Sequence, residues 1–181
     1  TFFILLPAVL CLWLAMPVQG QQYVRAIAFY NLENLFDTIH DEGKNDYEYL
    51  PDGGMKWTSH KYENKLQKMA YAISQIGTDE DPRGATCLGV AEVENIGCLE
   101  DLCGVLNGQY ARRYKPLLLE GPDRRGVDVG FLYDSTAFRP TRVTGHELKA
   151  HYADGGVVRS RLQLLVTGYL TGEGSPEKVH I

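Results

Sequence analysis

Two apolar runs in the sequence end in side chains that carry oxygen donors. Residues 23–30 are mostly apolar and lead into Asn31, and residues 85–91 are uncharged and lead into Glu92. An amide oxygen and a carboxylate are hard donors of the kind that suits Mg²⁺ or Mn²⁺. If the two runs form neighbouring strands, both side chains lie at one edge of a sheet. A turn-forming asparagine and a solvated glutamate are the ordinary alternatives, and this pattern alone leaves them open.

A second group of charged side chains surrounds a predicted tight turn at residues 121–126. Arg124 and Arg125 lie in this turn, and Asp128 follows on the returning strand, on the face that it shares with Gly130 and Leu132. A carboxylate at such a position is costly unless it is paired, hydrogen-bonded or near a metal ion. The two arginines could pair with Asp128 or hold a phosphate oxygen through their forked donors. Asp128 is therefore predicted to be either a site residue or one half of a structural ion pair.

The elements that must position these residues alternate between strand and helix in the first half of the chain. The strand at 23–30 is followed by a helix from Thr58 to Ile76, where Thr58 can cap, Trp57 can pack on Tyr62 and Gly77 can end the helix. The strand at 85–91 precedes a second helix, which Asn95 could cap and Gly108 could end.

The second half of the chain has the pattern of consecutive strands. They are predicted at residues 114–120, 127–133, 138–144, 157–170 and 178–181, with a hairpin turn at 171–176. Helices followed by consecutive strands indicate stacked β layers that are covered by helices.

Composition limits the choice of function. The 181 residues include 18 basic and 23 acidic side chains, which gives a net charge of −5. One globular domain with a sizeable core fits this length. The acidic balance argues against tight, sequence-blind binding to a polyanion through bulk charge, although a local basic site is compatible with it.

The N-terminal residues have the pattern of a secretory signal. Residues 2–18 are almost wholly apolar, and Val18-Gln19-Gly20 resembles a cleavage site, so we expect a signal peptide at 1–20 and a domain at 21–181. The protein is then exported to the periplasm or the extracellular space, with no stable membrane span after cleavage. Cys87, Cys98 and Cys103 remain in the exported part, and their disulfide status is open.

Three ordered strings carry a family resemblance. They are Phe-Tyr-Asn-Leu-Glu-Asn-Leu-Phe-Asp at 29–37, Gly-Val-Ala-Glu-Val-Glu-Asn at 89–95 and Arg-Arg-Gly-Val-Asp-Val-Gly-Phe-Leu-Tyr at 124–133. Together they resemble the endonuclease/exonuclease/phosphatase superfamily, particularly its secreted bacterial members, from about Tyr23 onward. The resemblance implies a four-layer α/β/β/α sandwich. Because the chain starts at Thr1 without a Met and stops within a predicted strand at Ile181, we expect only the N-terminal part of that domain, truncated at the C-terminus.

The resemblance also implies roles for individual residues. Asn31 matches an asparagine beside the catalytic centre, Glu92 matches the acidic metal ligand, and Glu33 occupies a position where some members carry a further site residue. Asn31, Glu92 and Asp128 are therefore the expected catalytic residues, and Asn31, Glu33 and Glu92 are the expected metal ligands. Arg161 matches a family arginine on the long strand, and we expect it to bind substrate with Arg124 and Arg125.

The activity implied by the resemblance is phosphoester hydrolysis that depends on Mg²⁺ or Mn²⁺. The substrate would be a nucleic acid, a phospholipid head group or a small phosphodiester, and no protein partner is inferred. The family's general base is a histidine oriented by an aspartate, and neither is found here, so we expect the chain alone to be inactive. A non-catalytic secreted module and a surface-anchored interaction domain are the alternatives.

Overall fold

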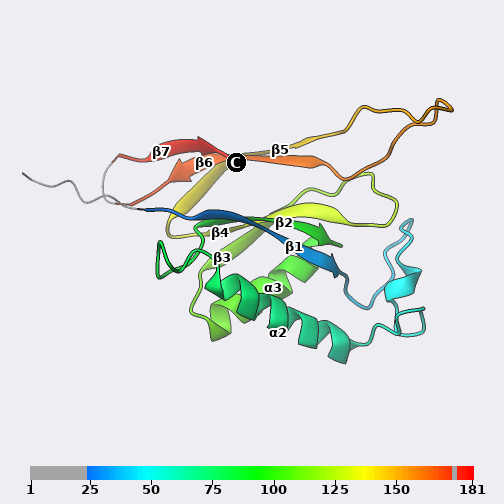
Figure 1. Cartoon of the computed structure of the whole chain (residues 1–181), viewed down its shortest axis with the longest axis horizontal. Helices are drawn as coiled ribbons and strands as arrows, with labels where there is room; N and C mark the ends of the chain where they lie inside the picture. Colours follow the sequence, from blue (N-terminus) through cyan, green and yellow to red (C-terminus); the bar gives the residue numbers. More distant parts are fainter. Residues whose placement is uncertain (1–23, 173–174) are drawn as a thin grey trace, which may run out of the picture.

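A computed structural model describes residues 24–172 and 175–181 of the chain (Figure 1). The predicted signal peptide at 1–20 lies outside the described residues. Within the described part, no helix has both the length and the apolar character needed to cross a membrane.

The described residues form two β-sheets and two α-helices. The first sheet has the strand order β1-β2-β4-β3, and the second has the order β5-β6-β7. Strands β1 and β2 are parallel, and all other pairs are antiparallel. The elements are β1 (Ile27–Leu35), the 3-10 helix η1 (Tyr47–Tyr49), α2 (Ser59–Gln75), β2 (Cys87–Val93), α3 (Ile96–Gln109), β3 (Tyr114–Leu118), β4 (Asp128–Asp134), β5 (Phe138–His146), β6 (Gln163–Leu170) and β7 (Glu177–His180).

The elements stack in layers, with α2 and α3 on one face of the first sheet and the second sheet on its other face (Figure 1). One apolar cluster fills the space between the helices and the first sheet and includes Leu32, Leu88 and Leu102. A smaller cluster lies between the two sheets and includes Phe131 and Phe138. This arrangement confirms the predicted two-sheet α/β class. Helices cover one side of the sandwich within the described residues.

The ends of the helices agree only in part with the sequence patterns. The Asn95 side chain accepts a hydrogen bond from the Cys98 N–H at 3.0 Å, which confirms the predicted cap of α3. Thr58 precedes α2 but makes no side-chain capping bond. Gly108 does not end α3, because the Tyr110 N–H still donates to the Leu106 carbonyl and continues the helical pattern past it. The prediction for Gly108 was wrong.

The predicted pairing of Trp57 with Tyr62 is replaced by other contacts. The Trp57 indole N–H donates to the Phe36 carbonyl, and its ring packs edge-on against Tyr49. Tyr62 instead donates its hydroxyl to Asp101 on α3. Trp57 therefore anchors the loop that follows β1.

The strand predicted at 157–170 is shorter in the structure. Strand β6 starts at Gln163, which pairs with His146 at the end of β5. Beyond that point the only bridge among the described residues joins His151 and Val157. Without a continuous partner the segment before β6 is not a strand, and Arg161 lies in this segment rather than on a long strand.

The cysteines of the described part are reduced and buried. Cys87 lies between the sheets, and Cys98 and Cys103 lie on the inner face of α3. Burial raises the pKa of each of these thiols to about 12. They therefore keep their protons and pack as small apolar side chains.

Candidate functional site

The parallel pair of β1 and β2 is irregular at the edge where both strands end. Asn31 pairs with Ala91, but the next pair joins Leu35 to Val93, so extra residues bulge out of both strands. Glu33 (φ 50°), Asn34 (φ 62°) and Glu92 (φ 63°) have left-handed backbone conformations at these bulges. Such conformations are unfavourable for residues other than glycine, and they concentrate at functional sites.

The bulge in β2 decides where the Glu92 side chain lies. Leu88 and Val90 face the helices, so strict alternation would place residue 92 in the same core. The left-handed turn places Val93 in the core instead. The Glu92 carboxylate is consequently 22% exposed, and its Oε1 lies 3.7 Å from a guanidinium nitrogen of Arg161.

Asn31 and Glu33 stand next to Glu92 at this edge. The Asn31 amide oxygen accepts a hydrogen bond from the Glu33 N–H at 2.8 Å, which stabilises the bulge of β1. The Lys65 ammonium of α2 donates to the carbonyls of Glu33 and Asn34. Burial lowers the pKa of Lys65, and the negative charges of Glu33 and Glu92 partly oppose that shift. Both carboxylates therefore share one electrostatic environment with Lys65.

The arginines of the predicted site have different partners. Arg161 pairs with Glu92, whereas Arg125 forms a salt bridge with Asp123 at 3.2 Å. This hydrogen-bonded pair raises the pKa of Arg125, and the charge of Glu92 contributes to the same shift. The exposed Arg124 side chain forms no ion pair with any residue of 24–172 or 175–181.

The predicted ion pair of Asp128 with Arg124 or Arg125 is not formed. The Asp128 side chain is buried, and its Oδ1 accepts a hydrogen bond from the Gly121 N–H at 2.9 Å. Its Oδ2 is buried without a hydrogen-bond partner in the described structure. Burial accordingly raises the pKa of Asp128. Arg125 is unavailable because the Asp123 carboxylate, two residues before it, accepts hydrogen bonds from both the backbone N–H and the guanidinium group of Arg125.

Asp128 nevertheless lies beside the irregular edge of the sheet. It pairs with Val93 in the register of β2 and β4, at the position where the bulge of Glu92 shifts that register. The hydrogen bond to Gly121 closes the turn that carries the two arginines. The structure thus places Asp128 behind the turn, while Asn31, Glu33, Glu92 and Arg161 lie at the sheet edge itself.

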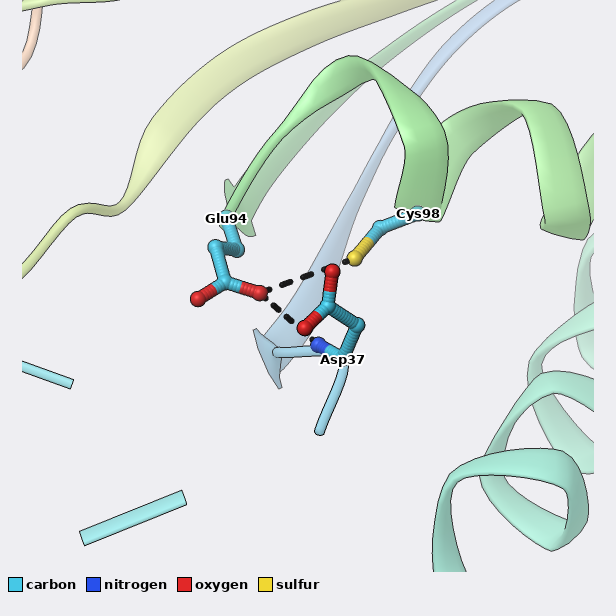
Figure 2. Close-up of side chains that lie close together, drawn as sticks. All are labelled: Asp37, Glu94 and Cys98. Atoms are coloured by element: carbon cyan, nitrogen blue, oxygen red, sulfur yellow. Dashed lines mark hydrogen bonds between the residues drawn. The ribbon is translucent and has the colours of Figure 1, made fainter. Parts of the chain in front are cut away.

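A second carboxylate cluster lies next to this edge, formed by Asp37, Glu94 and Cys98 (Figure 2). Their potential ligand atoms lie within 4.8 Å of one another, and within the described part they are the only such group of three His, Cys, Asp or Glu side chains. Glu94 Oε2 accepts the Asp37 N–H at 2.8 Å, and Asn95 donates to Asp37 Oδ2 at 3.2 Å. The cluster joins the loop after β1 to the start of α3.

The chemistry of this second cluster fits a structural role. Burial raises the pKa of Glu94 to about 8, so its side chain keeps a proton at neutral pH. A protonated carboxyl group and a thiol of high pKa are poor ligands for a hard divalent cation. Asp37 ends the first of the three motif strings, but it was not among the predicted site residues.

Comparison with known proteins identifies the family. Residues 26–178 match the Endonuclease/Exonuclease/phosphatase family, and the chain belongs to it. This is a superfamily of phosphoester hydrolases whose members generally use divalent metals. No curated protein matches the sequence.

Several solved structures are similar to this chain. One is an endonuclease/exonuclease/phosphatase family protein from Bacteroides thetaiotaomicron, with 13% identity, a TM-score of 0.49, and coverage of 86% of this chain and 48% of that chain. Another, from Bacteroides vulgatus, has 11% identity, a TM-score of 0.45, and coverage of 84% and 49%. A functionally unknown conserved protein from Enterococcus faecalis V583 has 15% identity, a TM-score of 0.44, and coverage of 85% and 50%. The chain therefore spans about half the length of these proteins.

Proposed function

We propose that this chain carries the metal-binding and phosphate-binding residues of a divalent-metal-dependent phosphodiester hydrolase. The observation that supports the proposal best is the orientation of Glu92. A strained backbone turns this carboxylate out of the apolar core and toward Arg161, beside Asn31 and Glu33. A chain rarely adopts such a conformation at a glutamate unless the position of the carboxylate matters.

The donors at this edge fit a hard cation. Glu92 and Glu33 offer carboxylate oxygens and Asn31 offers an amide oxygen, which are ligands that Mg²⁺ or Mn²⁺ prefers over softer metals. The contact of 3.7 Å between Glu92 and Arg161 is at the long end for an ion pair, so it leaves the carboxylate accessible. When bound, the metal ion would polarise a phosphoryl oxygen of the substrate.

The protein side chains would orient the phosphate group. Arg161 is close enough to the Glu92 carboxylate to donate to a phosphate oxygen held there. Lys65 adds a second positive charge at the same edge. The family resemblance assigns the general base to a histidine oriented by an aspartate, and none of the three motif strings supplies this pair. We therefore propose that the chain by itself binds metal and phosphate but does not turn substrate over.

Manganese binding tests the metal site without depending on turnover. Electron paramagnetic resonance of free Mn²⁺ would be recorded with the wild-type chain, with Glu92→Gln and with the control Glu63→Gln on the exposed face of α2. Loss of a direct ligand should weaken Mn²⁺ binding by at least the roughly 10- to 100-fold that loss of an outer-shell partner costs, whereas the control should bind as the wild type does. Equal Mn²⁺ affinity of Glu92→Gln and the wild type would exclude this metal site.

A hydrolysis assay addresses the remaining part of the proposal. Bis-aryl phosphate, nucleic acid and phospholipid would be incubated with the protein in Mg²⁺ or EDTA. We expect no metal-dependent product from the 181-residue chain. Turnover that EDTA abolishes would show that the general base lies within these residues, and the substrate that reacts would identify the class.

We also propose that the protein is exported, since residues 2–18 are apolar and a cleavage pattern precedes Gln21. N-terminal sequencing of the protein recovered from the periplasm or medium should begin at Gln21. Recovery of only the uncleaved form with the cell membrane would contradict this and favour the anchored alternative.

A further inference from the structure

A groove with three arginines lies beside the proposed site, between the turn at 121–126 and the segment at 147–160. Its volume is about 610 Å³, and its polar lining includes Asp123, Arg124, Arg125, Tyr152, Arg159 and Ser160. We refer to it as the arginine groove. Arg124 and Arg125 are predicted site residues, whereas Arg159 and Tyr152 are not, because nothing local in the sequence shows that the two segments face each other.

The arginine groove has an excess of positive charge. Asp123 is its only acidic lining residue, and the salt bridge to Arg125 compensates its buried carboxylate. Arg124 and Arg159 are exposed, and neither forms an ion pair within the described part of the chain. The whole chain has a charge of −5, so this concentration of positive charge is local. Such a surface attracts a polyanion at one place only.

Tyr152 gives the groove an aromatic surface. Tyr152 is 60% exposed, which is a large fraction for an aromatic residue. The hydrogen bond from the Tyr152 N–H to the Gly156 carbonyl at 2.7 Å and the bridge between His151 and Val157 hold its backbone in place. An exposed aromatic ring beside arginines is the arrangement that binds single-stranded nucleic acid, where bases stack on the ring and the backbone follows the charges.

The groove and the proposed metal site are linked through adjacent residues of the chain. Ser160 lines the groove, and the next residue, Arg161, contacts Glu92 at 3.7 Å. The charge of Glu92 also acts on Arg125. A phosphodiester held at Glu92 would therefore have neighbouring phosphates of the same strand at the arginines of the groove.

We infer that the arginine groove binds a single-stranded nucleic acid, with Arg124 and Arg159 on phosphates that flank the scissile one and Tyr152 stacked on a base. The position of the scissile phosphate rests on the proposed function. A phospholipid head group offers no row of phosphates for the separate arginines, and the bases of a duplex are already stacked and paired. A single strand offers phosphates to the arginines and an unpaired base to the ring of Tyr152.

Fluorescence anisotropy in EDTA tests the groove without any metal. The probe is a labelled oligothymidine of about 12 nucleotides, a length within the usual footprint of single-strand binding sites. Arg124→Ala/Arg159→Ala should weaken binding by at least about tenfold, and it should lower the salt slope by about 0.7 for each phosphate that the variant no longer binds. The double variant Arg113→Ala/Arg142→Ala removes the same charge outside the groove and should bind nearly as the wild type does.

A third variant separates stacking from charge. Tyr152→Ala should weaken binding by about tenfold and leave the salt slope unchanged, because it removes stacking and no group that binds phosphate. Equally weakened binding in the two arginine double variants would overturn the inference, since bulk charge would then explain binding. No binding by the wild type, tighter binding of duplex, or binding only to vesicles of anionic phospholipid would overturn it too. The Mn²⁺ titration of Glu92→Gln contains no nucleic acid, so failure of the metal site is detected separately.

Discussion

Glu92 and Glu94 lie two residues apart at the end of β2, and their environments are opposite. The Glu92 side chain is 22% exposed and faces Arg161, at the edge shared with Asn31. Glu94 is only 4% exposed, accepts the N–H of Asp37 and lies against Cys98 (Figure 2). Burial raises the pKa of Glu94 to about 8, so this side chain is a neutral acid at pH 7.

The contrast shows that backbone geometry, rather than residue type, decides which of the two carboxyl groups is partly exposed and which is buried. The backbone differs between the two positions, because residue 92 has a left-handed conformation and residue 94 follows the end of β2. The outward carboxylate is suited to binding a cation. The inward carboxyl group is suited to joining the loop after β1 to helix α3.

The strongest test of this contrast is to remove the inward side chain. Glu94→Ala leaves the partly buried Asp37 N–H without its acceptor and opens a cavity against Cys98, so it should lower the free energy of unfolding by about 2–3 kcal/mol. Glu92→Ala should change it by less than about 0.5 kcal/mol, because its side chain is partly solvated and weakly paired. Urea denaturation followed by circular dichroism measures both.

The same two variants can break the contrast through metal binding. Glu94→Ala should keep the Mn²⁺ affinity of the wild type under conditions where it is folded. If Glu94→Ala instead lost Mn²⁺ binding and Glu92→Ala kept it, the roles assigned to the two carboxyl groups would be reversed.

The dependence of stability on pH should reveal the neutral Glu94. Its pKa is about 8 in the folded state and near the ordinary 4.5 in the unfolded chain. Between these values the unfolded state releases the proton while the folded state keeps it, so stability falls as pH rises and levels off above about 8. The contribution is a few kcal/mol at most. Asp37, Asp41 and Asp46 also face Glu94, and their charges favour the protonated form.

Glu94→Gln isolates this contribution from those of other groups. The amide cannot ionise but keeps an oxygen to accept the Asp37 N–H, so the variant should show a flatter decline in the free energy of unfolding between about pH 5 and 8. Burial also raises the pKa of Asp128, but this residue is present in both proteins, so its contribution to the pH dependence cancels when the two profiles are compared. Superimposable pH profiles for the wild type and Glu94→Gln would mean that Glu94 is ionised in the folded protein.

A smaller effect is expected at the helix caps. Asn95 caps α3 and also donates to Asp37, so Asn95→Ala should cost about 1–2 kcal/mol. Thr58→Ala is the matched control, since Thr58 makes no side-chain capping bond to α2 and should cost only a few tenths of a kcal/mol. Thermal or urea denaturation of the two variants gives the comparison. Equal destabilisation would remove the special role given to Asn95 beside the Asp37 cluster.

Local patterns in the sequence predicted the framework of the molecule. The sequence predicted a helix that Asn95 could cap and Gly108 could end, and its apolar residues at 99, 102, 103 and 106 are all buried. The alternation after residue 127 placed Leu132 on the face opposite Phe131, and these residues do lie in the two separate clusters. Such predictions succeed because they depend only on which face of a single helix or strand is buried and which faces solvent.

Features that depend on distant segments were not predictable in this way. The bulges at Glu33 and Glu92 interrupt the two-residue period, and a period alone does not indicate where a strand breaks its own register. Arg125 was one of two possible partners for Asp128, but it pairs with Asp123, which is closer along the chain. Tyr152 and Arg159 join the turn at 121–126 only through the path of the segment between β5 and β6.

The parallel pairing of β1 with β2 has a consequence for how the molecule acquires its site. Asn31 and Glu92 meet only after the chain has closed on itself across the loop at 36–57 and all of α2. Closing a loop of this length costs conformational entropy, which slows the pairing of the two strands. Helix α2, in contrast, forms from contacts between neighbouring residues. During refolding, helical circular dichroism should therefore recover before Mn²⁺ can bind. A nascent chain that has emerged only as far as α2 would have helical structure and no trace of a cation site.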